Sequence, residues 1–210
     1  MRKLILKMSV SIDGFVRGAN GESDWIFRTG DDESKAWTVQ SISRAGVHIM
    51  GSSTFKDMAA YWPSSTEVFA APMNDIPKVV FSRKGRAGLE DGPSAKQLEQ
   101  ARANASSPPT TVNAEALASW TTARVASGPL AEEVARLKQE TGGPIVAHGG
   151  ASFAQSLIRE NLVDEYQLLV HPVALGGGLP IFSALTQPLT LELAELKRFP
   201  RGTVAHIYRR

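Results

Sequence analysis

Short apolar runs separated by helix-like segments constrain the fold of this 210-residue chain more than any other feature of its sequence. In the run Leu4–Val10, apolar residues occupy every second position and Ile5 is apolar on the opposite face. This pattern predicts a strand buried on much of both faces. Further strands are predicted at Val47–Met50, Lys78–Ser82, Ile145–His148, Tyr166–Val170, Leu189–Leu196 and Val204–Tyr208.

Helices are predicted between most of these strands. Asp31, Asp32 and Glu33 place negative charge at the start of a helix running towards Arg44, where carboxylates stabilise the positive end of the helix dipole. A further predicted helix begins after Thr54 and ends at Pro63. Two more cover Leu130–Lys138 and Ser152–Glu160. The alternation favours an α/β fold with a mostly parallel central sheet, helices on both faces and antiparallel strands at the C-terminal end.

One stretch, residues 85–118, breaks this pattern. It is rich in Ala, Ser, Pro, Gln and Asn and has few large apolar side chains. We predict a surface insertion there, with one helix at Ala95–Ala105, inside a single domain that covers residues 1–210.

Composition excludes several classes of protein. The formal net charge is only +2 and no dense basic block occurs, so nucleic acid is not an expected partner. The chain has no cysteine, which removes disulfides, thiolate metal sites and the cysteine ligands of a zinc deaminase, and no metal site is predicted. Met1–Val10 lacks the long apolar stretch of a signal peptide, and no window is apolar enough to span a bilayer. We therefore expect a cytoplasmic protein without a membrane partner.

Two strand-to-helix turns carry the strongest functional signal. Gly149-Gly150 follows one predicted strand, and Gly51-Ser52-Ser53-Thr54 follows another. Glycines at such a turn let the backbone approach a phosphate, and the free N–H groups of the following helix point at it. Two such turns on one sheet suit a pyrophosphate between them. Tight turns of purely structural origin, with Ser53 or Thr54 capping its own helix, are the alternative.

A third strand ends at Ser82-Arg83-Lys84, which combines a hydroxyl with two cations. This combination suits the 2′-phosphate of NADPH, although cations at a strand end can also be simply solvated.

These motifs, taken in order, resemble a known family. They are Ser11-Ile12-Asp13-Gly14, Ser23-Asp24-Trp25-Ile26, Gly51 to Thr54, Phe81-Ser82-Arg83, and a long block from Gly149 through Leu162-Val163-Asp164-Glu165 to Pro172-Val173 and Gly176-Gly177-Gly178-Leu179-Pro180-Ile181-Phe182. Together they are similar to the reductase domain of bacterial riboflavin biosynthesis, within the dihydrofolate-reductase-like superfamily. The resemblance covers nearly the whole chain and implies the three-layer fold of that superfamily.

The resemblance also implies roles for individual residues. NADPH is the implied cofactor, with Val10 and Ile12 along the nicotinamide and Trp25 packed on the cofactor. Its phosphates would meet residues of the three strand-end turns, namely Gly51, Ser53, Thr54, Ser82, Arg83, Gly149, Gly150, Ala151, Ser152 and Phe153. Ser23 would face the substrate, and a homodimer is implied.

The implied reaction is hydride transfer from NADPH to a heterocyclic substrate, either a pyrimidine-like riboflavin precursor or a pterin. Asp31 or Asp32 is the candidate acid, although acids at a helix start also serve structure. His148 stands where the riboflavin reductases tend to have a glutamate, so it is a candidate substrate contact, a proton relay or a buried structural histidine. The alternative function is a nucleotide- or ligand-binding protein of the same fold without turnover.

Overall fold

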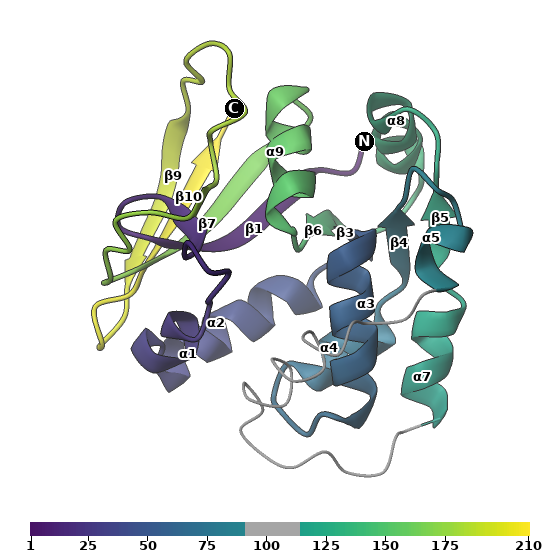
Figure 1. The fold of residues 1–210 in the computed structure, drawn as a ribbon, viewed down its shortest axis with the longest axis horizontal. Helices are drawn as coiled ribbons and strands as arrows, with labels where there is room; N and C mark the ends of the chain where they lie inside the picture. The colour runs from purple at the N-terminus through teal and green to yellow at the C-terminus, as the bar shows by residue number, and fades with distance from the viewer. Residues whose placement is uncertain (91–113) are drawn as a thin grey trace.

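An eight-stranded sheet organises the computed structural model, which describes residues 1–90 and 114–210 (Figure 1). Its strand order is β5-β4-β3-β6-β1-β7-β10-β9. The strands are β1 Leu4–Ser11, β3 Val47–Gly51, β4 Lys78–Phe81, β5 Arg124–Ala126, β6 Ile145–Ala147, β7 Glu165–His171, β9 Glu192–Arg198 and β10 Val204–Arg209. A separate two-stranded sheet pairs β2 (Phe15–Arg17) with β8 (Leu179–Pro180).

The direction of the strands confirms the predicted fold class. The pairs β1·β6, β1·β7, β3·β4, β3·β6 and β4·β5 are parallel, whereas β10 is antiparallel to both β7 and β9. Because the parallel strands share one direction, their carboxyl ends lie along one edge of the sheet. The turns that follow β3, β4 and β6 are therefore neighbours.

Helices cover both faces of the sheet. They are α1 Trp25–Thr29, α2 Asp32–Ser43, α3 Ser52–Tyr61, α4 Ala70–Asp75, α5 Ala87–Glu90, α7 Ala114–Thr121, α8 Leu130–Gln139 and α9 Ala151–Arg159, with a 3-10 turn at Trp62–Ser64. Figure 1 shows α8 and α9 on one side of the sheet and α1, α2, α4 and α7 on the other. Within the described residues no helix is both long and apolar enough to cross a membrane.

Two apolar cores match this layering. One contains Leu4, Leu6, Ile49 and Ile145 of the sheet together with side chains of α8 and α9 such as Leu157. The other contains Met50 and Val80 of the sheet together with Ile42, Met73 and Trp120 from α2, α4 and α7. Residues of β3 and β4 contribute to both cores, which explains why these strands read as continuous apolar runs.

The predicted insertion at residues 85–118 contains the start of a helix that packs into the domain. Helix α7 begins inside residues 85–118, and its Ala116 is buried at 7% exposure, so the C-terminal end of that range belongs to the folded domain. The predicted helix Ala95–Ala105 lies outside the described residues.

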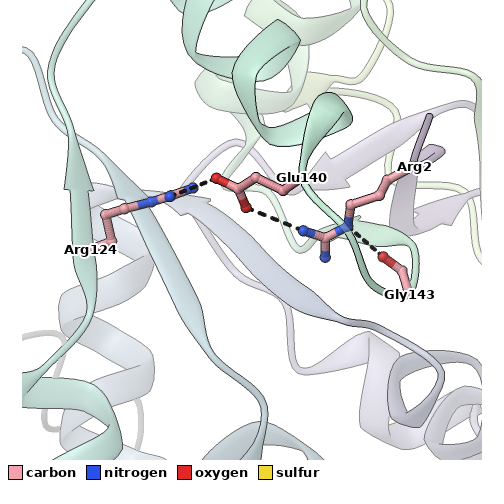
Figure 2. Close-up of polar contacts among 4 residues, drawn as sticks. All are labelled: Arg2, Arg124, Glu140 and Gly143. Carbon is pink, nitrogen blue, oxygen red and sulfur yellow. Dashed lines mark hydrogen bonds and ion pairs between the residues drawn. The ribbon is translucent and has the colours of Figure 1, made fainter.

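An ion-pair cluster ties the start of β1 to α8 and β5 (Figure 2). Glu140 accepts from Arg124 Nη1 at 2.7 Å and from Arg2 Nη1 at 3.4 Å, and Arg2 Nε donates to the Gly143 carbonyl at 2.6 Å. The Arg2 side chain is only 5% exposed, and burial lowers its pKa. The carboxylate of Glu140 therefore compensates a guanidinium that is largely removed from water.

Candidate active site

The two glycine turns touch each other across the sheet edge. The Gly51 N–H donates to the Gly149 carbonyl at 3.3 Å. A Cβ built on Gly150 would lie 2.7 Å from Thr54 Oγ1, and one built on Gly51 would lie 3.2 Å from Phe153 Cβ. Gly149 has φ +85°, which favours glycine. The structure thus brings together the two turns that the sequence predicts as a pyrophosphate site.

Neither helix start at these turns is closed by a side chain. The N-cap residues of α3 and α9 are Gly51 and Gly150, which have no side chain to accept from the first N–H groups. The capping alternative for Ser53 and Thr54 is therefore wrong, since both lie inside α3. Uncapped N–H groups at two adjacent helix starts form a polar, positive edge suited to an anion.

A groove of about 710 Å³ runs along this edge. It is lined by most of the predicted cofactor residues: Gly51, Ser53, Thr54, Ser82, Arg83, Gly150, Ala151, Ser152 and Phe153. Arg17 and Arg159 add two further cations to its wall. The groove thus combines phosphate-ready backbone with guanidinium groups, which is a donor set that fits a phosphorylated dinucleotide.

A second cavity, of about 430 Å³, adjoins the groove, because Arg17 and Ser53 line both. It contains Ser23 and His148, the two predicted substrate residues. Its wall is mainly apolar and aromatic, with Ile26, Phe27, Ile42, Met58, Trp62, Phe69 and Met73. Such a cavity beside a cofactor groove suits a flat, mostly apolar ring system.

Lys7 contributes a buried positive charge to the lining of this cavity. It lies on β1, is 8% exposed, and places Nζ 3.4 Å from Thr38 Oγ1 and 5.1 Å from the centre of the Trp37 ring. Burial lowers its pKa from 10.5 to about 8. An ammonium with a pKa this close to neutral can donate a proton more readily than an exposed lysine.

Asp57 on α3 faces the same cavity. Its Oδ1 is buried and has no hydrogen-bond partner among the described residues. Burial raises the pKa of Asp57, while the charge of Arg17 opposes the rise. A buried carboxyl oxygen left without a partner is costly in an empty cavity and is ready to bind a polar ligand group.

Arg17 is held between the two cavities by the C-terminal glycine block. Strand β2, which carries Arg17, pairs with β8, and a Cβ on Gly178 would lie 2.1 Å from the Arg17 carbonyl. Gly178 also has φ +135°, a backbone conformation that disfavours residues with a side chain. Both the close contact and the backbone conformation therefore require glycine at this position. Gly178 therefore acts on the site indirectly, through the placement of Arg17.

His148 points towards a second histidine. Its Nε2 lies 2.8 Å from Nδ1 of His48, whose Nε2 lies 3.1 Å from the Pro72 carbonyl. Burial lowers the pKa of His148 well below 6.5, and the charges of His48 and Lys7 lower it further. His148 is thus a neutral imidazole at the cavity wall.

The structure does not bring the predicted acids to either cavity. Asp31 is the N-cap of α2: Oδ1 accepts from the Ser34 N–H at 2.8 Å and Oδ2 from the Arg201 N–H at 2.9 Å. Asp32 is fully exposed and pairs with Lys35 at 3.6 Å. Both carboxylates stabilise the start of α2. The prediction that one of them is the catalytic acid is therefore corrected: the structural alternative applies to both.

Four predicted cofactor residues also lie outside the groove lining. Val10 is buried in the core, and Ile12, which follows β1, is 64% exposed and lines neither cavity. Trp25 is 2% exposed and packs edge-on against His171, with ring centres 5.3 Å apart, so it does not offer its face to the groove. Gly149 supports the turn from behind, since a Cβ there would lie 2.9 Å from Met8 Sδ.

Three residues with groups suited to the site, Lys7, Arg17 and Asp57, do not figure among the sequence predictions. For Lys7 the sequence does contain a usable signal: it lies in the middle of an apolar strand, and lysines are rarely buried without a compensating role. Arg17 and Asp57 leave none, since each is an ordinary charged residue in a loop-like or helical context.

Sheet order, the two adjoining cavities and the cradle of helix starts define an α/β domain with the dihydrofolate reductase-like fold. Dihydrofolate reductase from Enterococcus faecalis, solved with NADP(H), aligns over 99% of this chain and 96% of its own with a TM-score of 0.53 at 11% identity.

The chain belongs to the family of RibD C-terminal domains, which it matches over residues 2–205. YyaP and YwjB of Bacillus subtilis are 28% and 29% identical to it, over 99% of this chain and 94% and 98% of their own lengths. Acinetobacter baumannii RibD aligns over the whole chain and 58% of its own, with a TM-score of 0.64 and 20% identity. The predicted family and fold are confirmed.

Proposed function

We propose that this protein is an NADPH-dependent reductase that transfers hydride to a heterocyclic substrate bound in the smaller cavity. Membership of the RibD C-terminal family supports an oxidoreductase role. Solved proteins of similar fold include a pyrimidine reductase-like protein from Corynebacterium diphtheriae, with a TM-score of 0.61 at 15% identity. Pyrimidine-like riboflavin precursors and pterins are the proposed substrate classes.

The contact between the two uncapped helix starts carries this proposal. A pyrophosphate in the groove would accept from N–H groups at the starts of α3 and α9 and from Thr54. Arg83, at the end of β4 in the same groove, is the proposed partner of the 2′-phosphate. When bound, NADPH would supply the hydride, while the protein supplies position and a proton.

Within the smaller cavity, Lys7, Asp57 and His148 are proposed to donate the proton and to bind the substrate. Lys7, with its pKa lowered to about 8, is the proposed proton donor to the reduced substrate. Asp57 and His148 would bind polar edges of the ring, and the apolar wall would hold its faces and exclude water.

Binding without turnover is the second candidate function, because the predicted acids Asp31 and Asp32 lie away from the cavities. One experiment separates the two. NADPH is titrated into the protein while its fluorescence is followed, and NADPH oxidation is then measured with a panel of pterins, dihydrofolate and the riboflavin precursor. Binding with oxidation supports the reductase, and binding without oxidation supports the alternative. No binding at high micromolar NADPH contradicts both.

A homodimer remains part of the proposal. Strand β9 forms an edge of the sheet and is exposed along its whole length, with Leu193 and Leu196 at 50% and 55% exposure. The unpaired backbone of this edge strand, together with the two exposed leucines, is the proposed contact between the two copies. Sedimentation of the protein as a monomer only would contradict the dimer.

A further inference from the structure

His48 has no role in the proposed mechanism. It contacts His148, which lines the proposed substrate cavity. It lies on β3 and is completely buried, with its ring centre 4.5 Å from that of His148 at an interplanar angle of 72°. Its two ring nitrogens are both engaged, one with His148 and one with the Pro72 carbonyl. A buried imidazole with two defined partners has a defined tautomer.

The tautomers follow from the Pro72 carbonyl, which can only accept. At 3.1 Å from this oxygen, His48 Nε2 must carry the proton, so in the neutral ring Nδ1 has a free lone pair. His148 Nε2 lies 2.8 Å from that lone pair and must therefore be the donor. In neutral His148 the remaining nitrogen, Nδ1, is then an acceptor.

Burial, aided by nearby positive charges, keeps both rings neutral. Burial lowers the pKa of His48 to about 4, and the charge of Lys78 on β4 acts in the same direction. Lys7 on β1 similarly disfavours a proton on His148. The chain of hydrogen bonds also ends at a carbonyl, which cannot take up a proton. The pair is thus suited to hold an orientation and unsuited to conduct protons.

We propose that His48 is a positioning residue that fixes His148 as a hydrogen-bond acceptor towards the cavity, and that the cavity selects heterocycles presenting a ring N–H there. The identity of the ligand class rests on the proposed function, whereas the tautomer does not. An analogue in which the N–H is replaced by N-methyl is rejected, because it has no proton to donate to this acceptor and its methyl group fills the space of the hydrogen bond.

The tautomer is tested by ¹⁵N NMR of the histidine side chains at pH 7, which is tractable because the chain has only four histidines. The expected spectrum has His148 protonated at Nε2 and unprotonated at Nδ1. In His48→Leu the acceptor is lost and His148 is expected to sample both tautomers. In His48→Asn the side-chain oxygen can take the position of Nδ1, and the wild-type pattern is expected to return.

An Nδ1-protonated His148 in the wild type, or an unchanged His148 pattern in His48→Leu, overturns the positioning role. If His48→Leu fails to fold, the wild-type and His48→Asn spectra still decide, because a protonated Nδ1 in either contradicts it.

Ligand selection is tested by calorimetry with lumazine, whose pyrimidine ring has two N–H groups, and with 1,3-dimethyllumazine, which has neither. 6,7-Dimethyllumazine is the matched control, because it adds two methyl groups but keeps both N–H groups. Lumazine and the control are expected to bind at least about ten-fold more tightly than 1,3-dimethyllumazine. The gap is expected to narrow in His48→Leu and to return in His48→Asn.

Equal affinities for the three lumazines, or no binding of any, overturn the ligand class. Titration with NADPH in parallel reports separately on the proposed function. Loss of cofactor binding there, with the histidine spectra as expected, contradicts the reductase but leaves the positioning of His148 in place.

Discussion

Adding one methyl group at Gly150 should weaken NADPH binding without unfolding the protein. Gly150 has φ −58°, a conformation that alanine adopts freely, so Gly150→Ala carries little backbone strain. The new Cβ would, however, lie 2.7 Å from Thr54 Oγ1 and must displace that hydroxyl.

The expected loss of NADPH affinity follows from the proposed hydrogen bond between the Thr54 hydroxyl and the pyrophosphate. A hydrogen bond between a hydroxyl and a charged phosphate contributes about 1.5–3 kcal/mol, so its loss weakens binding roughly 10- to 100-fold. Thr54→Ala should produce a similar loss by removing the hydroxyl itself. In the double variant the Cβ no longer meets Oγ1, so the two effects should combine to much less than their product.

Fluorescence titration with NADPH measures all four proteins, and urea unfolding shows that each remains folded. Wild-type affinity in a folded Gly150→Ala variant would refute the placement of the pyrophosphate between the helix starts. Strict additivity in the double variant would instead refute the contact between Gly150 and Thr54 as the cause.

Three further predictions address the groove, the fold and the cavity. Arg83→Ala should weaken NADPH binding roughly 10- to 100-fold and leave NADH binding nearly unchanged, whereas Arg86→Ala should change neither, as calorimetry with both cofactors can show. Glu140→Gln should lower the free energy of unfolding by about 1–3 kcal/mol, since the buried Arg2 loses its counter-charge, and a urea midpoint equal to wild type would contradict this. Lys7→Met should abolish turnover yet raise stability at pH 7 by about 3 kcal/mol, because a lysine whose pKa falls from 10.5 to about 8 on folding costs stability at pH values below 8. That gain should shrink as pH rises from 8 towards 10.5, where the unfolded state alone still binds the proton, and urea unfolding at pH 7 and pH 10 would detect a gain that does not shrink.

The sequence predicts the fold well, and with it the position of the two glycine turns, because both depend on local patterns. Apolar runs of four to eight residues ended by Gly51 or Gly149 specify strand, turn and helix within about a dozen residues. Strands β3 and β6 then need only be neighbours for the two turns to meet. Strand β5 and helix α4 are absent from the predictions because each is short and has no distinctive period.

The acid illustrates a different limit of sequence reasoning. Asp31 and Asp32 stand at a helix start, and the same position suits a capping carboxylate and a catalytic one. Only the partners decide between them, and here they are the Ser34 and Arg201 N–H groups. Arg201 lies far away in sequence, so no local pattern could have revealed the bond.

The substrate cavity is the least predictable part because side chains from distant segments create it. Lys7 comes from β1, Asp57 from α3 and His148 from the end of β6, and their chemistry depends on how deeply the assembled fold buries them. The proposed cofactor groove instead offers backbone N–H groups, which every helix start possesses whatever its sequence. Substitutions can therefore alter the cavity while leaving the groove intact. His148, which stands beside the glycine turn where the resemblance implies a glutamate, is a position of this kind: a change there would alter the proposed substrate cavity and leave the proposed cofactor site intact.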